Sequence, residues 1–237
     1  MNKYIIFGPL GWHKNIWDRI FDENYCVIHF EFPYANNIKS YEELKEAILK
    51  KINLIDGKCK IITSSYGTSI FLSMLADIHV KIESIVIIDG IEDSFPDIKE
   101  IKNICDNRVY VFKDIITFLN QYLDENEMKQ PYLIEVVKSL VKINDEFNIE
   151  HYLDNNTLFQ YLEFLVGDDI HNKISNNFAN LDIPTILFTT NNIKINRSNI
   201  QIIKIDEDDH LLMLTKPSML KKYITVVLVH KWMPNLL

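Results

Sequence analysis

The chain has 237 residues, 47% of them hydrophobic, and a formal net charge of −8. These values are typical of a soluble globular protein with one large α/β domain or two small ones. The acidic balance excludes a general nucleic-acid partner, and no apolar run approaches the roughly 18 residues of a membrane span. Cys26, Cys59 and Cys105 have no paired or metal-like spacing, which favours a reduced cytoplasmic protein without a signal peptide.

The first elements alternate between strand and helix character. Residues 4–7 predict a buried strand, a glycine-bearing loop follows at residues 8–12, and a helix is expected over residues 15–21. A glycine loop after a strand can present a backbone N–H to a developing oxyanion, and here the donor would be Leu10 or Gly11 because Pro9 has none. A plain strand-to-helix turn is the alternative. His13, beside this loop, is expected at the surface.

Residues 26–32 predict a second strand, which ends at Pro33. His29 and Glu31 alternate with apolar residues, so they are interpreted as positions on the strand's face and not as a catalytic pair. Ser40 and Glu43 have the spacing of a capping box, which predicts the start of a helix. The apolar face of that helix has the following members: Leu44, Ala47, Ile48 and Ile52.

The most informative stretch covers residues 60–76. A strand-like run, residues 59–62, gives way to small polar residues and then to helical spacing at Ile70, Leu72 and Met74. Ser65 lies at the sharp turn, with Thr63 and Gly67 as small neighbours two positions away. Such flanks suit the strained strand-to-helix elbow that exposes a nucleophilic serine. A serine-rich helix N-cap is the alternative interpretation.

A strand at residues 85–88 ends in Asp89-Gly90, and the strand rhythm then disappears until about residue 180. Residues 112–123, 132–142 and 158–166 show helical spacing. We therefore expect a sheet covered on both faces, with a core of residues 1–91 and 181–237 and a helical lid of residues 92–180 inserted between strands. A separate helical domain is the alternative.

Strand character returns at residues 184–189 and 200–205. An acidic run with Asp206, Asp208 and Asp209 leads to His210, and Pro217 suits the first turn of a closing helix that extends to about residue 232. Ser65, Asp89 and His210 each come just after a predicted strand. Because the carboxyl ends of parallel strands share one edge of a sheet, these three side chains are expected to converge there.

The chemistry of such a triad is well defined. The serine attacks an acyl carbon, the histidine takes its proton, and a carboxylate orients the imidazole. Asp89 is the preferred acid because the loop at residues 190–197 has no carboxylate, although an ordinary Asp-Gly turn is the alternative. The sequence has neither a zinc-protease motif nor a GxGxxG dinucleotide fingerprint.

At this point the residues resemble a known family. The elbow at Ser65-Tyr66-Gly67, the strand ending in Asp89-Gly90 and the run from Asp209 and His210 to Met213-Leu214 look like the thioesterase domains of nonribosomal peptide and polyketide synthases. The resemblance covers nearly the whole chain and implies an α/β-hydrolase fold. It also implies that Ser65 is acylated, that His210 is the base and acid, that Asp89 is its partner, and that the N–H groups of Tyr66 and Leu10 form the oxyanion hole. Thr63 stands where the family usually has glycine.

The leading hypothesis is a serine thioesterase that releases an acyl or peptidyl chain, by hydrolysis or cyclisation, from the phosphopantetheine arm of an acyl or peptidyl carrier protein. A thioester is already activated, so no metal or redox cofactor is expected. The alternatives are a small-molecule carboxylesterase with the same triad and a catalytically degenerate hydrolase fold that acts as a binding module. The identity of the acyl chain, the carrier protein and the oligomeric state stay open at this level.

Overall fold

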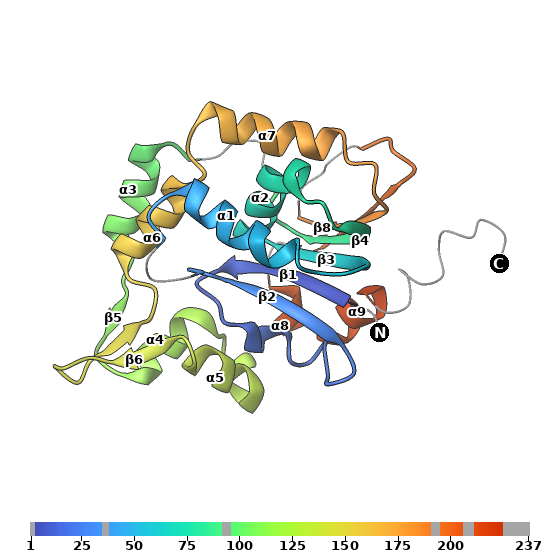
Figure 1. Cartoon of the computed structure of the whole chain (residues 1–237). Coiled ribbons are helices and arrows are strands. Elements are labelled where there is room, and N and C mark those ends of the chain that lie inside the picture. The colour runs from blue at the N-terminus through green and yellow to red at the C-terminus, as the bar shows by residue number, and fades with distance from the viewer. Residues whose placement is uncertain (1–2, 35–37, 92–95, 191–194, 206–210, 225–237) are drawn as a thin grey trace.

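A computed structural model of the chain describes residues 3–34, 38–91, 96–190, 195–205 and 211–224. Its main sheet has six strands in the order β2-β1-β3-β4-β8-β9, and every neighbouring pair is parallel (Figure 1). The strands are β1 (Lys3–Leu10), β2 (Cys26–Phe32), β3 (Lys58–Ser64), β4 (Lys81–Ile88), β8 (Thr185–Thr189) and β9 (Ile200–Lys204). The predicted parallel sheet is confirmed. The chain order reverses beside β1, because β2 lies on one side of it and β3 on the other.

Helices cover both faces of this sheet. On one face lie α1 (Tyr41–Ile52), α2 (Tyr66–Met74) and α7 (Asp168–Ala179), and on the other lie the short 3-10 helix η1 (Lys14–Trp17), α8 (Leu212–Thr215) and α9 (Pro217–Lys222) (Figure 1). Another 3-10 turn, η2 (Leu75–Asp77), continues α2. Parallel strands need such cover because both of their faces carry apolar side chains.

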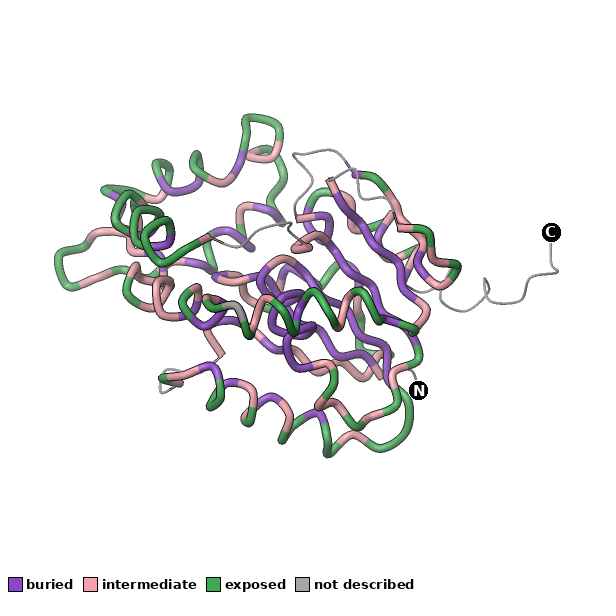
Figure 2. The backbone as a smooth tube through the Cα atoms, turned by 90° about the horizontal axis from the view of Figure 1, so that it is seen from above, coloured by how far each residue is buried: buried purple, intermediate pink, exposed green. Residues whose placement is uncertain are grey.

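The strand residues alternate between two hydrophobic cores. Ile5 and Phe7 face the core beneath α2, whereas Tyr4 and Ile6 face the core above α8. The same alternation separates Ile61 from Ile62, Ile85 from Val86, and Leu187 from Phe188. Figure 2 shows the buried strands at the centre and exposed turns of helix around them. A period of two residues in a strand therefore places one apolar set in each core.

Local sequence explains where α1 begins. The side chain of Ser40 accepts a hydrogen bond from the N–H of Glu43 at 3.2 Å, and the Glu43 carboxylate accepts one from the N–H of Lys39 at 2.8 Å. The predicted N-cap is thus confirmed, although Glu43 reaches back to Lys39 and not to Ser40 itself. These bonds satisfy N–H groups that a helix start leaves without intrahelical partners.

The helix predicted over residues 15–21 is not present as an α-helix. Helical geometry there is limited to the one turn of η1, which is followed by irregular turns. The apolar spacing of the segment still has a role, because Ile16, Trp17 and Ile20 are all buried in the core above α8. A single 3-10 turn suffices to bring these side chains to one side.

The region between β4 and β8 contains more than helices. It comprises α3 (Ile98–Asn107), α4 (Ile115–Tyr122), η3 (Glu127–Lys129), α5 (Pro131–Lys138) and α6 (Asn155–Glu163), followed by α7. It also contains a three-stranded antiparallel sheet in the order β5-β7-β6, with β5 (Val111–Phe112), β6 (Val141–Ile143) and β7 (Ile149–His151). The expectation that this region lacks strands is therefore wrong.

The sequence of the β6–β7 hairpin explains why the small sheet forms. Val141 and Ile143 alternate with Lys142, and they pair with His151 and Ile149 across the turn. The side chain of Asn144 accepts hydrogen bonds from the N–H groups of Glu146 and Asn148, which closes the turn. The helical spacing predicted for residues 132–142 therefore ends at Lys138, where this period of two begins.

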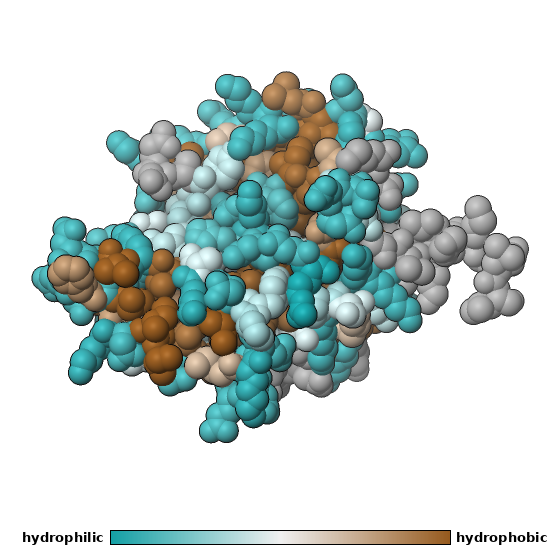
Figure 3. Space-filling model, turned by 90° about the horizontal axis from the view of Figure 1, so that it is seen from below, coloured by the Kyte–Doolittle hydropathy of each residue, from teal (hydrophilic) through white to brown (hydrophobic). Residues whose placement is uncertain are grey.

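Three further predictions concern the cysteines, the membrane spans and the closing helix. Cys26, Cys59 and Cys105 are all free thiols, and no helix among the described residues has both the length and the apolar character of a membrane span. The closing helix begins at Pro217 as predicted, but residues 225–237 lie outside the described part. Figure 3, viewed from below, shows hydrophobic atoms gathered over α4 and the β6–β7 hairpin, where Ile116, Ile143 and Phe147 are exposed.

Candidate active site

Ser65 lies between β3 and α2 in a rare backbone conformation. Its φ is 51° and its ψ is −125°, a combination that residues other than glycine rarely adopt. The N–H of Ser65 donates to the carbonyl of Ile88 at 3.2 Å, and its own carbonyl accepts from the N–H of Thr68 at 2.8 Å. The predicted sharp turn is present at Ser65, and hydrogen bonds hold both of its peptide groups.

Position 67 requires glycine because the backbone of β1 passes close to it. A Cβ at this position would lie 2.4 Å from the carbonyl oxygen of Phe7 and 2.5 Å from that of Gly8. No side chain fits at such distances, so glycine allows the first turn of α2 to approach the end of β1. The small flank predicted two residues after Ser65 has this physical cause.

Asp89 follows β4 directly and stands beside the Ser65 turn. The strand register pairs Ser64 with Ile88, so Ser65 and Asp89 are the next residues of two adjacent strands. Asp89 also has a positive φ, 56°, and its N–H donates to the carbonyl of Phe188 at 2.9 Å. Gly90 packs against the turn, because a Cβ there would lie 2.4 Å from the carbonyl oxygen of Ser65.

Two threonine hydroxyls connect the serine turn to the aspartate turn. Thr68 Oγ1 lies 3.0 Å from Thr63 Oγ1 and 3.0 Å from the backbone carbonyl oxygen of Asp89. A carbonyl oxygen can only accept, so the single hydroxyl hydrogen of Thr68 serves Asp89 and the hydroxyl of Thr63 donates to Thr68. Thr63 is completely buried. The threonine that replaces the expected glycine is thus paired and part of the site's framework.

His210 lies outside the described residues, as do Asp206, Asp208 and Asp209. The residues on either side are described. Ile205 donates its N–H to the carbonyl of Thr189 at 3.0 Å, at the carboxyl end of β8, and Leu212 is fully buried at the start of α8. Ser65 and Asp89 are therefore brought together by the structure, whereas the role of His210 stays a prediction.

The two predicted oxyanion donors come from neighbouring elements. Tyr66 is the first residue of α2, and Leu10 is the last residue of β1. The N–H of Gly11, the other donor that the loop offered, donates to the carbonyl of Phe32 at 2.8 Å and is already engaged. This favours Leu10 over Gly11, and the oxyanion role of both backbone groups stays a prediction.

The side chain of Tyr66 has a structural role. Its hydroxyl donates to the carbonyl of Tyr161 at 2.8 Å, and the hydroxyl of Tyr161 accepts from the N–H of Tyr34 at 2.8 Å. Complete burial, followed by the proximity of Tyr161 and Tyr41, holds the pKa of Tyr66 well above its usual value. Tyr66 thus stays neutral and ties α6 to the helix that begins at the serine.

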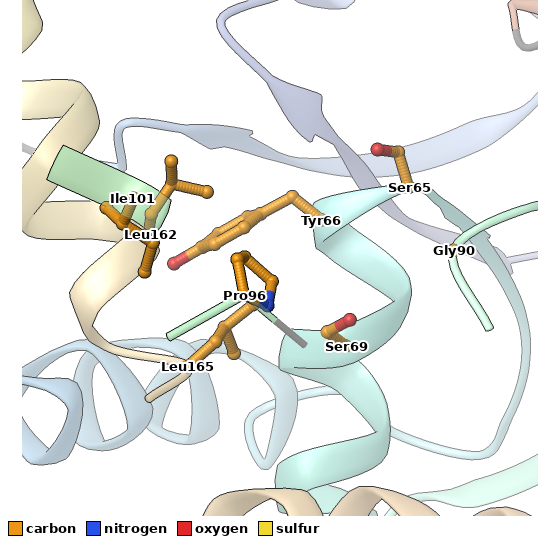
Figure 4. Close-up of a pocket in the computed structure, with 8 residues that line it drawn as sticks. All are labelled: Ser65, Tyr66, Ser69, Gly90, Pro96, Ile101, Leu162 and Leu165. Carbon is orange, nitrogen blue, oxygen red and sulfur yellow. The ribbon is translucent and has the colours of Figure 1, made fainter. Parts of the chain in front are cut away.

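A cavity of about 150 Å³ opens beside Ser65. Figure 4 shows Ser65 and Gly90 at one end of it and apolar side chains of α3 and α6 at the other. The wall residues are Ser65, Tyr66, Ser69, Gly90, Pro96, Ile101, Leu162 and Leu165. Sequence reasoning missed Thr68, Ser69 and the walls from α3 and α6. A threonine in the first turn of the helix after Ser65 could have been identified from the sequence as a residue close to the site. No sequence pattern predicts that residues of α3 and α6 form the cavity wall.

His13, in the loop after β1, contacts a residue of β2 and the residue that follows β7. His13 Nδ1 lies 3.2 Å from Glu31 Oε2, and its ring stacks on Tyr152 with centroids 4.3 Å apart. The hydrogen bond from His13 is the main cause that lowers the pKa of Glu31. His13 therefore pairs with a strand residue and a ring of the inserted region, where the sequence had suggested a surface position.

Two more histidines are neutral because of burial. Burial lowers the pKa of His29 to about 4, despite the opposing effect of Glu31. Burial, and then the charges of Arg108 and His13, lower the pKa of His151 to about 3, while its Nδ1 accepts from the N–H of Leu153 at 3.0 Å. Within the described residues, no group of three or more histidine, cysteine, aspartate or glutamate side chains could hold a metal ion.

Comparison with protein-family models gives no match. Comparison with the sequences of curated proteins gives none either. Solved structures, in contrast, share the fold over almost the whole chain. E-2-(acetamidomethylene)succinate hydrolase has a TM-score of 0.68 at 12% identity, with 94% of this chain and 90% of that chain covered.

Two other solved structures share the fold at slightly lower TM-scores. The thioesterase domain from the curacin biosynthetic pathway has a TM-score of 0.65 at 11% identity, over 94% of this chain and 90% of that chain. A carboxylesterase from the ammonia-oxidizing thaumarchaeon Nitrososphaera gargenis has a TM-score of 0.63 at 14% identity, over 96% and 90%. The chain therefore has the α/β-hydrolase fold, as the sequence resemblance implied.

Proposed function

We propose that this chain is a serine hydrolase that cleaves an activated acyl compound, an ester or thioester, through an acyl-enzyme intermediate on Ser65. The observation that carries the proposal is the backbone of Ser65, which is held at a positive φ between β3 and α2 by hydrogen bonds to Ile88 and Thr68. Strain of this kind costs on the order of 1–3 kcal/mol and persists where a side chain must be presented in one geometry.

The reaction would run in two steps. Ser65 Oγ attacks the acyl carbon while His210 takes its proton, and the imidazolium then protonates the departing alcohol or thiol. Water deprotonated by His210 attacks the acyl-Ser65 ester, and the imidazolium returns the proton to the departing Ser65 Oγ as the acid is released. Asp89 orients the imidazole, and the N–H groups of Tyr66 and Leu10 stabilise the oxyanion in both steps.

We further propose that the leaving group is a thiol, delivered as a thioester on the phosphopantetheine arm of an acyl or peptidyl carrier protein. Support comes from the sequence resemblance at residues 65–67, 89–90 and 209–214, and from a thioesterase domain among the similar folds. An oxygen ester is the competing substrate, since a carboxylesterase is equally similar in fold. The ratio of kcat/KM for matched thioesters and oxygen esters separates the two substrates.

Intact mass after exposure to a fluorophosphonate tests the nucleophile. One adduct is expected on the wild type, none on Ser65→Ala, and slow formation on Asp89→Asn and His210→Ala. Ser64→Ala is the matched control, because Ser64 precedes Ser65 and is completely buried at the end of β3. Absence of an adduct on the folded wild type would overturn the proposal in favour of a binding module.

A further inference from the structure

Leu10, one of the two predicted oxyanion donors, ends β1, and the chain around it depends on support from other segments. Gly8 and Gly11 lack the side chains that restrict a backbone, and Gly11 has a φ of 80°. The register of β1 against β2 also shifts between Phe7 and Leu10. The position of the Leu10 N–H is therefore set by the contacts that the loop after β1 makes with its neighbours.

The end of β2 supplies the first support. The N–H of Gly11 donates to the carbonyl of Phe32 at 2.8 Å. Two residues later, His13 Nδ1 lies 3.2 Å from Glu31 Oε2. The hydrogen bond with His13 lowers the pKa of Glu31, so the carboxylate is charged at neutral pH and can only accept. Nδ1 of His13 therefore carries the hydrogen, and the loop is bonded to β2 on both sides of Trp12.

The inserted region supplies the second support. The ring of His13 stacks on Tyr152, with centroids 4.3 Å and planes 23° apart. Tyr152 stacks in turn on His151, the last residue of β7, at 5.3 Å. Gly11 lies against the same segment, because a Cβ there would lie 2.9 Å from Leu153 Cδ2. The loop is thus held between the end of β2 and the end of β7.

His13 is the residue at which the two supports meet. Its side chain is 34% exposed and that of Glu31 is 36% exposed. A pair this exposed is screened by water, so the bond to Glu31 is weak by itself. The face of Tyr152 restrains the imidazole from a second direction. Together the two contacts fix the chain three residues after Leu10.

We propose that His13 is a positioning residue for the reaction at Ser65. Its contacts with Glu31 and Tyr152 hold the loop after β1, so that the N–H of Leu10 is directed at the developing oxyanion. The inserted region then takes part in forming the oxyanion hole as well as the cavity. This proposal rests on the proposed hydrolysis at Ser65 and adds a residue that acts through the loop and not on the substrate.

Hydrolysis of p-nitrophenyl acetate tests the proposal. For His13→Ala, kcat is expected to fall about tenfold at unchanged KM, because acylation and deacylation both pass through an oxyanion that the bound substrate lacks. Removal of an oxyanion donor costs about 100- to 1,000-fold, and the loss here is smaller because Leu10 keeps its N–H. Fluorophosphonate labelling of Ser65 is expected to slow by a similar factor, since phosphonylation uses the same donors.

Three further variants separate the contacts of His13. Tyr152→Leu removes the stacked ring and is expected to lower kcat at unchanged KM as well. His13→Asn keeps an N–H donor for Glu31 and is expected to recover most of the kcat that His13→Ala loses. Glu31→Gln added to His13→Ala is expected to cause no further loss, because both changes break the same hydrogen bond.

Two controls separate positioning from general stability. His79→Ala removes an exposed histidine, and Ile48→Val shortens a fully buried side chain of α1. Both are expected to keep the kcat of the wild type, although Ile48→Val lowers the temperature of unfolding. Thermal unfolding of every variant accompanies the kinetics.

The outcomes distinguish the two proposals. If fluorophosphonate labels Ser65 and His13→Ala keeps the kcat of the wild type, or changes KM alone, the role of His13 is wrong and the hydrolase stands. The same conclusion follows if Ile48→Val loses as much kcat as His13→Ala. If the folded wild type is neither labelled nor active, both proposals fail. Tyr152→Leu and His13→Asn test the same loop if His13→Ala does not fold.

Discussion

At the scale of single residues, the site depends on peptide groups that are fixed by their neighbours. Ser65 and Asp89 both have positive φ values, which cost free energy for residues with a side chain. Hydrogen bonds from the N–H groups of Ser65 and Asp89 to the next strands hold these conformations. The candidate nucleophile and the candidate acid are thus positioned by backbone contacts before any substrate binds.

Thr68 is the side chain that connects the two turns, and its replacement is predicted to be costly. Thr68→Val keeps the shape but leaves the carbonyl of Asp89 and the hydroxyl of Thr63 without this partner. The expected loss is about 1–3 kcal/mol in the free energy of unfolding. We also expect kcat for ester hydrolysis to fall about tenfold at unchanged KM, because Asp89 loses its anchor.

Urea unfolding and steady-state kinetics measure these effects. Thr68→Ser restores the hydroxyl and is expected to restore both stability and kcat. Equal losses in Thr68→Val and Thr68→Ser would show that the methyl group, and not the hydrogen bond, is what the site requires.

At the scale of elements, the close approach of β1, α2 and the turn after β4 defines the site. Gly67 allows α2 to touch the end of β1, and Gly90 allows the turn after β4 to touch Ser65. Parallel strands bring their carboxyl ends together, but only residues without a Cβ let the backbones meet at these two points. The geometry at Ser65 is therefore a property of three elements together.

Two glycines with nearly the same φ allow the cost of a left-handed backbone to be distinguished from the cost of a steric clash. Gly57 has a φ of 83° and open space around it, whereas Gly90 has a φ of 86° and the carbonyl oxygen of Ser65 in the way. Gly57→Ala is expected to lower the free energy of unfolding by about 1–2 kcal/mol, the cost of the left-handed conformation. Gly90→Ala is expected to cost more than this and to abolish labelling at Ser65.

Thermal unfolding together with fluorophosphonate labelling checks this comparison. Because Gly57 precedes β3 at its amino end, labelling of Gly57→Ala should equal that of the wild type. Similar stability losses in the two variants, with labelling retained in Gly90→Ala, would contradict the close contact.

At the scale of the whole molecule, the inserted region is joined to the sheet on both faces. Its α6 packs toward the core beneath α2, while its α4 and α5 contribute to the core above α8. The turn η1 adds a polar contact, since the Asn15 side chain donates to the Ser139 hydroxyl at 2.9 Å. The cavity beside Ser65 thus has walls from both the sheet-bearing part and the inserted part.

Buried histidines make the stability of the whole chain sensitive to acid. The folded pKa of His151 is about 3, compared with 6.5 for an ordinary histidine. Below about pH 6.5 the unfolded chain binds a proton that the folded chain excludes, so stability is full above that pH and falls toward pH 3. We expect this group to remove about 1–3 kcal/mol between pH 7 and pH 4.

His151→Asn keeps an acceptor near the N–H of Leu153 and removes the titration. Chemical unfolding at several pH values should therefore show a smaller loss between pH 7 and pH 4 for this variant. His79→Asn replaces an exposed histidine and is the matched control. An unchanged pH dependence in His151→Asn would mean that the imidazole is not excluded from protonation in the folded chain.

The sequence by itself determined the strands of the main sheet, the start of α1 and the turn at Ser65. These features follow from short continuous apolar runs, from a cap three residues before Glu43 and from small residues around one serine, all of which are local. The proximity of the Ser65 turn to the Asp89 turn was also predictable, because adjacent parallel strands end at a common edge.

Only the tertiary structure decided which segments meet at that edge. The hydrogen bond from Thr68 to Asp89 and the one from Tyr66 to Tyr161 join residues that lie 21 and 95 positions apart. The small sheet replaced part of a predicted helix because pairing across a hairpin outweighed local spacing. Long-range packing and hydrogen bonds carry no periodic signal in the sequence, so they emerge only when the chain is folded.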